Sequence, residues 1–413
     1  MRQLSVFLCN DYVGLLTCDS RQHFSFQYDL QWISKKHVSP LSLSLPIREE
    51  AYSDEKTRPF FTNLLPESAV REAVARKLGI SLRNDFGLLE ALGGECAGAV
   101  TLLPEDVQPE KEHKYRELSA EQLHKIIKEL SINPFLAGES GIRLSLAGAQ
   151  EKLPVYMEKD RFFLPQGTSP SSHIIKPNIK DIDSSVRNEA FCMGLAKNLG
   201  LLVPRVEVMT VQEDLYVVDR YDRIRDEKGK LYRLHQEDFC QAIGFMPENK
   251  YEEEGGPSLS DCFSLIDRFS TNPALDRKQM LDWIIFNYLI HNADGHAKNL
   301  SLILSPDEIR LAPFYDLICT GIYGGINEKL AMKIGGENRL QWLMQRHWER
   351  LAEGIGIRTK FVLQNVMKMA TQIEDAAHKL ASEQQKKWGP TSIVEQIQKI
   401  IAKQVKHTKS AIG

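Results

Sequence analysis

The sequence predicts an α+β protein with a protein-kinase-like, two-lobed fold: a β-rich N-lobe with an extra N-terminal α/β subdomain, then an all-α C-lobe. Two observations lead to this prediction. Short alternating strand patterns dominate residues 1–234, whereas helical patterns dominate from His235 onward. A polar loop early in the helical part contains Asp294 and, five residues later, Asn299, which is the spacing of catalytic base and metal-binding amide in protein kinases.

The composition is that of a globular protein of two or three domains, with 413 residues of which 42% are hydrophobic and 26% charged. A formal net charge of −3 provides no overall basic field, so nucleic-acid contact is expected only through a local patch or a partner. The seven cysteines are scattered without a C-x-x-C pair, which predicts reduced thiols. Because no signal-peptide or membrane-span pattern occurs, we expect a cytoplasmic protein without membrane contact.

Residues 1–104 are predicted to form the N-terminal subdomain. Alternating apolar residues indicate a small antiparallel sheet with strands near residues 4–8, 13–16 and 24–28, and a later strand at 100–103. Two helices are expected, Ser68–Leu78 with Gly79 as its stop and a second that begins at Asn84 or Asp85 and ends at Gly93.

Asp85-Phe86-Gly87 spells the D-F-G motif of kinases, but it lies far upstream of the catalytic loop and at a predicted helix start. We therefore interpret Asp85 as a helix cap. A densely charged, proline-containing stretch from Pro104 to Glu117 follows this subdomain and predicts a domain boundary.

Residues 118–234 are predicted to form the kinase N-lobe with its phosphate loop. A capping box at Ser119–Gln122 begins a helix. A second helix is expected from Ser185 to Leu199, with Gly200 as its stop. The predicted strands cover residues 143–146, 153–157, 162–164, 172–176, 206–209 and 215–218.

Residues 235–413 are predicted to form the helical C-lobe with the catalytic loop. The loop follows a helical pattern that ends at Leu289 and precedes a hairpin over residues 300–311. The chain ends in two helices that carry Lys386, Lys387, Lys399, Lys403, Lys406 and Lys409. A solvated helix face is the simplest interpretation of these lysines, and contact with DNA phosphates is the alternative.

Transfer of a phosphoryl group requires a phosphate cradle and a cation on the phosphates. The cradle candidate is the loop between two predicted strands, Ala147, Gly148, Ala149, Gln150, Glu151 and Lys152, whose small residues let backbone N–H groups approach phosphate oxygens. Alone, this stretch would more often be a tight hairpin turn. The cation candidate is Lys176 at a strand end, with Glu189 on the next helix as its expected ion-pair partner. A solvated lysine is the alternative there.

The hinge between the lobes is predicted at Asp219, Arg220 and Tyr221, where a hydrophobic strand gives way to charged residues. Its backbone could form hydrogen bonds with an adenine edge. An ordinary strand end would look the same in the sequence.

In the polar loop, Asp294 is the expected catalytic base, Lys298 would neutralise charge on the transferred phosphoryl group, and Asn299 would bind Mg²⁺. The second predicted metal ligand is Asp316, directly after the hairpin, where it could otherwise be a turn or cap residue. His296 and Ala297 complete the part of the loop expected to line the ATP site.

Histidines flank the predicted base and leave a second interpretation open. His291 and His296, together with Asp294, could form a metal site of a nuclease or hydrolase. Such a zinc site usually needs a further ligand, so we expect His296 to orient the loop or contact a phosphate, and His291 to cap the helix end.

Seven motifs along the chain resemble the HipA family, the serine/threonine-kinase toxins of bacterial toxin–antitoxin pairs. They occur in the family order at Pro40–Pro46, Phe60–Pro66, Gly98–Leu102, Ser145–Lys152, His173–Lys176, Gln236–Gln241 and Asp294–Asn299. In this resemblance Asp219 stands where a glutamate is usual, and Gly295 where alanine is usual.

The resemblance implies a kinase that uses ATP and Mg²⁺ to phosphorylate a serine of an aminoacyl-tRNA synthetase, glutamyl-tRNA synthetase, and so stalls translation and promotes persistence. It places the phosphate loop, the ATP lysine, the hinge, the base and the metal ligands on the residues named above, and an autophosphorylated serine on Ser145. It also implies a HipB-like helix-turn-helix antitoxin dimer as partner, with operator DNA bound mainly through that antitoxin.

Two other functions fit parts of the sequence. A small-molecule kinase of the aminoglycoside-phosphotransferase type shares the Asp-to-Asn spacing, but the N-terminal subdomain and the phosphate loop do not suit it. A catalytically silent corepressor would not need Lys176, Asp294, Asn299 and Asp316 together.

Overall fold

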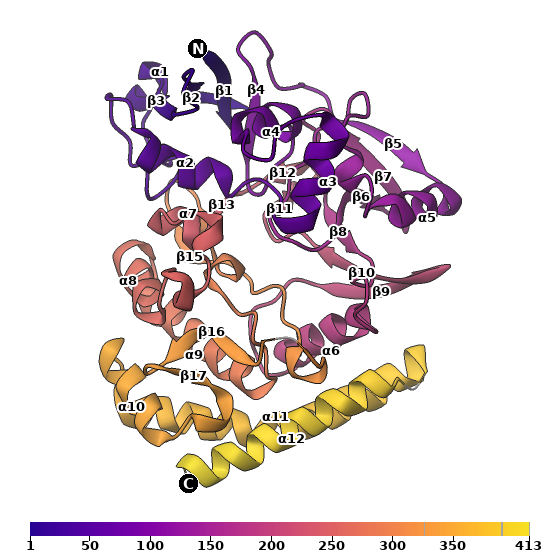
Figure 1. Cartoon of the computed structure of the whole chain (residues 1–413), viewed down its shortest axis with the longest axis vertical. Helices are drawn as coiled ribbons and strands as arrows, with labels where there is room; N and C mark the ends of the chain where they lie inside the picture. The colour runs from indigo at the N-terminus through magenta and orange to yellow at the C-terminus, as the bar shows by residue number, and fades with distance from the viewer. Residues whose placement is uncertain (326, 390, 413) are drawn as a thin grey trace. The chain divides into compact units, whose positions relative to one another are not determined.

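The computed structural model describes residues 1–325, 327–389 and 391–412 (Figure 1). The chain divides into two compact units. The first unit comprises Met1–Pro177, Met209–Glu248 and Leu302–Ile309. The second comprises Asn178–Val208, Asn249–Ser301 and Arg310–Gly413. These units do not follow the three predicted segments, 1–104, 118–234 and 235–413, which stay predictions.

The first unit begins with a four-stranded antiparallel sheet in the order β3-β2-β1-β4, which confirms the predicted N-terminal sheet. Its strands are β1 Arg2–Leu8, β2 Asp11–Cys18, β3 Phe24–Tyr28 and β4 Val100–Pro104. Helices α1 Leu30–Ser34, α2 Asp54–Thr62, α3 Ser68–Leu78 and α4 Asp85–Leu92 accompany it. Phe26, Phe60 and Phe61 are fully buried in the core of this unit, where burial of large apolar side chains supplies most of the driving force for folding.

Two helix ends in this region follow the prediction and one residue does not. Gly79 ends α3 in a left-handed conformation (φ 66°), as expected. Asn84 is the N-cap of α4, because its side chain accepts a hydrogen bond from the backbone N–H of Gly87. The interpretation of Asp85 as the cap was wrong: Asp85 lies in the first turn, and its carboxylate is held by Arg58 and Arg71.

A six-stranded sheet in the order β5-β7-β6-β8-β10-β9 forms the rest of the kinase-like β region. Its strands are β5 Lys114–Leu118, β6 Leu153–Glu158, β7 Arg161–Gln166, β8 His173–Lys176, β9 Val206–Val211 and β10 Glu213–Asp219. Helix α5 Ala120–Glu129 begins at the predicted capping box of Ser119 and Gln122, and the 3-10 turn η1 spans Pro134–Leu136.

One local prediction in this region needs correction. The predicted strand at residues 143–146 does not form, because Leu144 makes only an isolated bridge to Glu95, and Ser145 bonds to loop backbone rather than to a strand. Most of β5 lies within the charged stretch Pro104–Glu117, and β5 forms an edge of the six-stranded sheet, while the domain boundary placed in this stretch stays a prediction.

A buried ion cluster joins the N-terminal segment to residues after β10. Glu95 accepts hydrogen bonds from Arg220 (2.9 Å) and Arg223 (2.6 Å), and Asp222 accepts two from Arg220 (3.0 and 2.7 Å). Burial alone would raise the pKa of Glu95, but the two arginines hold it below its usual value. The remaining elements of this region are β11 Arg223–Arg225, β12 Leu231–Arg233, β13 His235–Asp238, α7 Phe239–Ile243, β14 Ser301–Leu304 and β15 Ile309–Leu311.

The second unit is mainly helical. Its helices are α6 Ser185–Asn198, α8 Leu259–Phe269, α9 Pro273–Leu289, α10 Gln345–Gly354, α11 Thr359–Trp388 and α12 Ser392–Ile412. Short 3-10 turns are η2 Pro247–Asn249, η3 Glu252–Glu254, η4 Ala297–Asn299, η5 Thr320–Ile322 and η6 Leu340–Trp342. The unit also contains a hairpin that the sequence analysis did not expect, β16 Lys329–Ile334 and β17 Glu337–Arg339.

The two C-terminal helices, α11 and α12, pack against each other, as the yellow end of Figure 1 shows.

The seven cysteines are all free thiols, as predicted. Within the part of the chain that the structure describes, no helix has both the length and the apolar character to cross a membrane.

Candidate active site

The loop after α9 is fixed by hydrogen bonds of its backbone. His291 takes a left-handed conformation (φ 54°) just beyond the helix, and its carbonyl accepts hydrogen bonds from the backbone N–H of Thr320 (3.0 Å) and Gly321 (3.2 Å). The Thr320 hydroxyl donates to the same carbonyl (2.9 Å) and accepts from the Ala293 N–H (2.8 Å). The segment at Thr320 therefore sets the shape of the loop that carries Asp294.

Asp294 and Asn299 are connected directly. The side-chain amide nitrogen of Asn299 donates to the backbone carbonyl of Asp294 (3.0 Å), and Asn292 Oδ1 accepts from the Asp294 N–H (3.0 Å). Since the amide nitrogen of Asn299 is used in this way, its amide oxygen is the atom suited to a cation. The Asp294 side chain is 53% exposed, as a group that receives a substrate must be.

Tyr251 contacts the predicted base. Its hydroxyl donates to Asp294 Oδ1 (2.6 Å), and its ring packs edge to face on His296 with ring centres 5.2 Å apart. His296 Nε2 lies 3.8 Å from the same carboxylate oxygen, which is beyond hydrogen-bonding distance. Sequence reasoning missed Tyr251, because it is far from the loop in the chain and no local motif marks it.

The turn that carries Tyr251 is fastened to β16. The Glu252 carboxylate accepts a hydrogen bond from the Lys333 N–H (2.6 Å), and Glu253 pairs with Lys329 (3.1 Å). Gly256 closes the turn, and a Cβ there would lie 2.1 Å from the Asn249 carbonyl oxygen. Tyr251 is therefore presented by a constrained turn.

Asp316 lies in the segment between β15 and η5 with a left-handed backbone (φ 54°), which is uncommon for a residue other than glycine and clusters at functional sites. The adjacent Tyr315 hydroxyl donates to the carbonyl of Lys298 (2.7 Å) and lies 2.9 Å from Ser301 Oγ. The structure thus brings the Asp316 segment to the residues beside Asn299. A carboxylate and an amide oxygen are the ligand types that Mg²⁺ prefers, so these residues fit the cation.

The alternative histidine metal site gains no geometric support. Among residues 1–325, 327–389 and 391–412, no group of three or more His, Cys, Asp or Glu side chains is arranged to hold a metal ion. His291 is partly withdrawn from solvent, and burial lowers its pKa.

The predicted phosphate loop lies in the first unit and is seated on the N-terminal region. The Gly148 carbonyl accepts a hydrogen bond from the Glu67 N–H (3.2 Å), and Lys152 Nζ donates to the Ala147 carbonyl (2.7 Å). Gly148 has φ 105°, and a Cβ there would lie 2.8 Å from Lys152 Nζ. This position requires glycine, as a backbone cradle for phosphate does.

Ser145 lies at the start of that loop and is fully buried. Its hydroxyl donates to the Leu64 carbonyl (2.7 Å), and its N–H donates to the Glu95 carbonyl (2.9 Å). The hydroxyl is therefore enclosed by protein while the loop is seated.

Lys176 lies beside the phosphate loop. Leu153 pairs with Ile175 across β6 and β8, so the register places Lys152 and Lys176 next to each other. Lys176 is buried, with Nζ 5.4 Å from the centre of the Tyr216 ring. Glu189 is buried on α6 in the second unit, and its pairing with Lys176 stays a prediction.

The predicted hinge residues are held by different partners. Asp219 Oδ1 lies 3.0 Å from His173 Nε2, and the Tyr221 hydroxyl hydrogen-bonds Gln236. The Arg220 guanidinium belongs to the buried Glu95 cluster. A nucleotide-binding role for these three residues stays a prediction, and for Arg220 it would have to use the backbone carbonyl, because the Arg220 N–H donates to the Ser172 carbonyl (3.0 Å).

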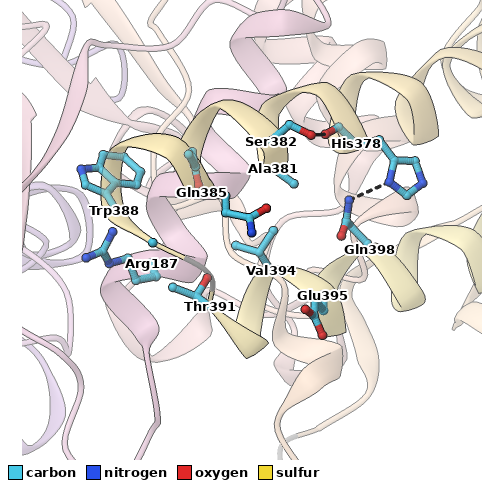
Figure 2. Close-up of a pocket in the computed structure, with 12 residues that line it drawn as sticks. Arg187, His378, Ala381, Ser382, Gln385, Trp388, Thr391, Val394, Glu395 and Gln398 are labelled. Carbon is cyan, nitrogen blue, oxygen red and sulfur yellow. Dashed lines mark hydrogen bonds between the residues drawn. The ribbon is translucent and has the colours of Figure 1, made fainter.

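Cavities occur within the described part of the second unit. A cavity of about 420 Å³ is lined by Tyr251, Asp294, Thr320 and the first residues of β16, among others. A smaller cavity, about 240 Å³, lies between α11 and α12 (Figure 2). Beside it, Arg187 of α6 stacks over Trp388, with the guanidinium carbon Cζ 5.0 Å from the ring centre.

Comparison with known proteins gives the same family over most of the chain. Residues 4–103 match the HipA N-terminal domain model, and residues 144–388 match the HipA-like C-terminal domain model. The serine/threonine-protein kinase toxin HipA of Shewanella oneidensis is 30% identical over 389 residues, covering 90% of this chain and 88% of its own. Y4mE of Sinorhizobium fredii, whose name carries a provisional kinase assignment, is 40% identical over 91% of both chains.

A solved structure extends the likeness to the fold. The HipA chain of a Shewanella oneidensis complex of HipA, HipB and operator DNA superposes with a TM-score of 0.87 at 27% identity, over 99% of this chain and 98% of that one. The predicted kinase-like fold class is therefore confirmed. The chain belongs to the HipA family of serine/threonine-protein kinases.

Proposed function

We propose that this kinase transfers the γ-phosphoryl group of ATP to a serine of a protein and acts as the toxin of a toxin–antitoxin pair. The observation that carries the proposal is the hydrogen bond from Asn299 to the Asp294 carbonyl, which fixes a carboxylate and an amide at kinase spacing in one loop.

Each site residue has a role in this proposal. Asp294 orients the acceptor hydroxyl and accepts its proton, and Lys298 offsets negative charge on the transferred group. Asn299 and Asp316 hold Mg²⁺, which neutralises phosphate charge when bound. His296 and Ala297 line the nucleotide site from the same loop.

The first unit supplies further nucleotide-binding groups. Backbone N–H groups of residues 147–152 bind phosphate oxygens, and Lys176 adds a cation, with Glu189 as its proposed ion-pair partner. The backbone of Asp219, Arg220 and Tyr221 binds the adenine edge.

We propose glutamyl-tRNA synthetase as the acceptor, in line with the HipA resemblance. Its modification would stall translation in the cytoplasm, arrest growth and promote persistence. A HipB-like antitoxin dimer would neutralise the kinase and bring it, as a corepressor, to operator DNA. The likeness to the HipA chain of a complex with HipB and operator DNA over nearly the whole chain supports this partner.

We also propose that Ser145 is an autophosphorylation site that switches the kinase off. A phosphate carries about −2 charge, and the buried Ser145 hydroxyl faces the Leu64 carbonyl, which would repel it. Phosphorylation would therefore unseat residues 147–152 and weaken ATP binding.

Incubation with labelled ATP and Mg²⁺, alone and with glutamyl-tRNA synthetase, tests these proposals. We expect label on Ser145 and on the synthetase, and no transfer by Asp294→Asn. Label on small aminoglycosides instead of protein would contradict the proposal. Equal, background label with wild type and Asp294→Asn would indicate a silent corepressor.

A further inference from the structure

We propose that the cavity beside Asp294 is an acceptor subsite that binds an aliphatic side chain adjacent to the phosphorylated serine. This inference rests on the proposed protein-kinase function and adds a sequence preference to it. Nothing in the role of Asp294 itself requires such a preference.

The walls of the cavity are chemically suited to an aliphatic group. Ile179 and Ile182 line it from the segment before α6, Ile318 from the segment after Asp316, and Leu330 and Ala331 from β16. The volume of about 420 Å³ is sufficient for one leucine or methionine side chain together with part of its backbone. Removing such a side chain from water is favourable in proportion to its apolar area.

The position of the cavity connects it to the transferred group. Asp294 is part of its wall, and so is Tyr251, whose hydroxyl reaches Asp294 Oδ1 at 2.6 Å. The serine hydroxyl of a peptide that lies against this wall can therefore contact the Asp294 carboxylate. Successive Cα atoms are about 3.8 Å apart, so a side chain in the cavity belongs to a residue within one or two positions of the serine at Asp294.

The rim adds a charge preference. Glu254 is exposed at the rim, whereas Glu253 is paired with Lys329. With Asp294 the rim carries an excess of negative charge. An acidic residue beside the serine is therefore disfavoured relative to a neutral or basic one.

Thr320, in the segment after Asp316, gives a reason why a side chain bound in the cavity would affect turnover. Thr320 lines the cavity and at the same time holds the His291 carbonyl and the Ala293 N–H of the catalytic loop. A bound side chain would contact the residue that shapes the loop carrying the base.

The test uses the full-length protein and peptides that contain one serine. Each position from three before to three after the serine carries leucine, phenylalanine, glycine or glutamate in turn, and kcat/KM is measured for each peptide. We expect one position within two residues of the serine to favour leucine over glycine by about tenfold or more, with glutamate the poorest.

Cavity variants locate the preference. Ala331→Leu fills the cavity and should reduce the leucine preference to about twofold or less, with kcat/KM for the glycine peptide retained. Ile182→Ala, at the half-buried wall, should shift the preference toward phenylalanine and provides a second test if Ala331→Leu folds poorly. The matched control is Ala381→Leu, the same change in the other cavity of this unit (Figure 2), which should keep the wild-type preference.

Two results would overturn the subsite: no flanking preference in the wild type, or a leucine preference unchanged in both cavity variants. Transfer to the protein acceptor but to no peptide would also count against it, because local recognition would then be insufficient. Transfer to neither would instead refute the proposed protein-kinase function, on which the subsite depends.

Discussion

The phenolic hydroxyl of Tyr251 donates a 2.6 Å hydrogen bond to Oδ1 of Asp294. Tyr251 comes from a turn fastened to β16, and Asp294 comes from the loop after α9, 43 residues later. One oxygen of the carboxylate is therefore held, which restricts rotation of the side chain and leaves the second oxygen in a defined direction for an acceptor hydroxyl.

Tyr251→Phe should lower kcat by about tenfold or more, because a hydrogen bond to a charged group contributes about 1.5–3 kcal/mol. The KM for ATP should change by less than about threefold, since Tyr251 acts through Asp294. The control is Tyr232→Phe, which removes an exposed tyrosine–aspartate hydrogen bond in the first unit and should leave both constants unchanged. An unaltered kcat in Tyr251→Phe would show that the bond does not position the base.

Asp316→Asn should raise the Mg²⁺ concentration needed for activity and lower kcat by about 100-fold, because a neutral amide binds a hard cation more weakly than a carboxylate does. The measurement is a Mg²⁺ titration at constant ATP. Asp307→Asn, which changes a carboxylate that is 89% exposed in the adjacent hairpin, is the matched control. Equal Mg²⁺ dependence of Asp316→Asn and wild type would remove Asp316 from the metal site.

Ser145 variants should separate packing from charge. Ser145→Ala loses one buried hydrogen bond, so we expect a loss of about 1 kcal/mol in unfolding free energy and retained ATP binding. Ser145→Asp places a carboxylate against the Leu64 carbonyl and should weaken ATP affinity by tenfold or more, measured by calorimetry. Ser264→Asp, on the exposed side of α8, controls for added charge. Wild-type affinity in Ser145→Asp would contradict the proposed switch.

Glu237 should make stability fall with rising pH. Burial raises its pKa from 4.5 to about 8, although the Ser42 hydroxyl and the Leu43 N–H lower it somewhat. Between these two values the unfolded chain loses the proton while the folded protein keeps it, so unfolding becomes easier by about 1.4 kcal/mol per pH unit. Below pH 4.5 and above about pH 8 the contribution of Glu237 to the free energy of unfolding is constant.

Glu237→Gln removes this titration and can retain both hydrogen bonds, because its amide oxygen accepts and its amide nitrogen donates. We expect the free energy of unfolding of the variant to equal that of wild type near pH 4.5 and to exceed it by roughly 2–4 kcal/mol near pH 8. Thermal unfolding from pH 5 to 9 measures this, with Glu254→Gln as an exposed control. Parallel stability curves for Glu237→Gln and wild type would contradict a raised pKa.

Local patterns predicted much of the fold because their causes are local. The capping box at Ser119 and the left-handed stop at Gly79 depend on neighbouring residues, and both form as expected. The strand predicted at 143–146 failed because its backbone bonds to Glu95 and the Ser145 hydroxyl bonds to the Leu64 carbonyl, and both partners are distant in the sequence. The β16–β17 hairpin was missed among helical patterns.

In the candidate site, too, features set by neighbouring residues were predicted and contacts between distant residues were not. The spacing of Asp294 and Asn299 is a local property, and the bond between them is present. Tyr251 could not be found from the sequence, because its contact with Asp294 depends on a turn that Glu252 and Glu253 fasten to β16. The hinge role of Arg220 stays a prediction, and no local pattern could indicate that its side chain is held by Glu95, a partner 125 residues away.

The enclosure of the Ser145 hydroxyl would limit the rate at which the kinase inactivates itself. Because the hydroxyl is fully buried, a phosphate can reach it only when the loop opens, and the frequency of opening sets the upper limit on the rate. If phosphoryl transfer is faster than reclosing of the loop, a population of active molecules would decay with the lifetime of the closed loop. Substitutions that tighten the loop would lengthen growth arrest without altering catalysis.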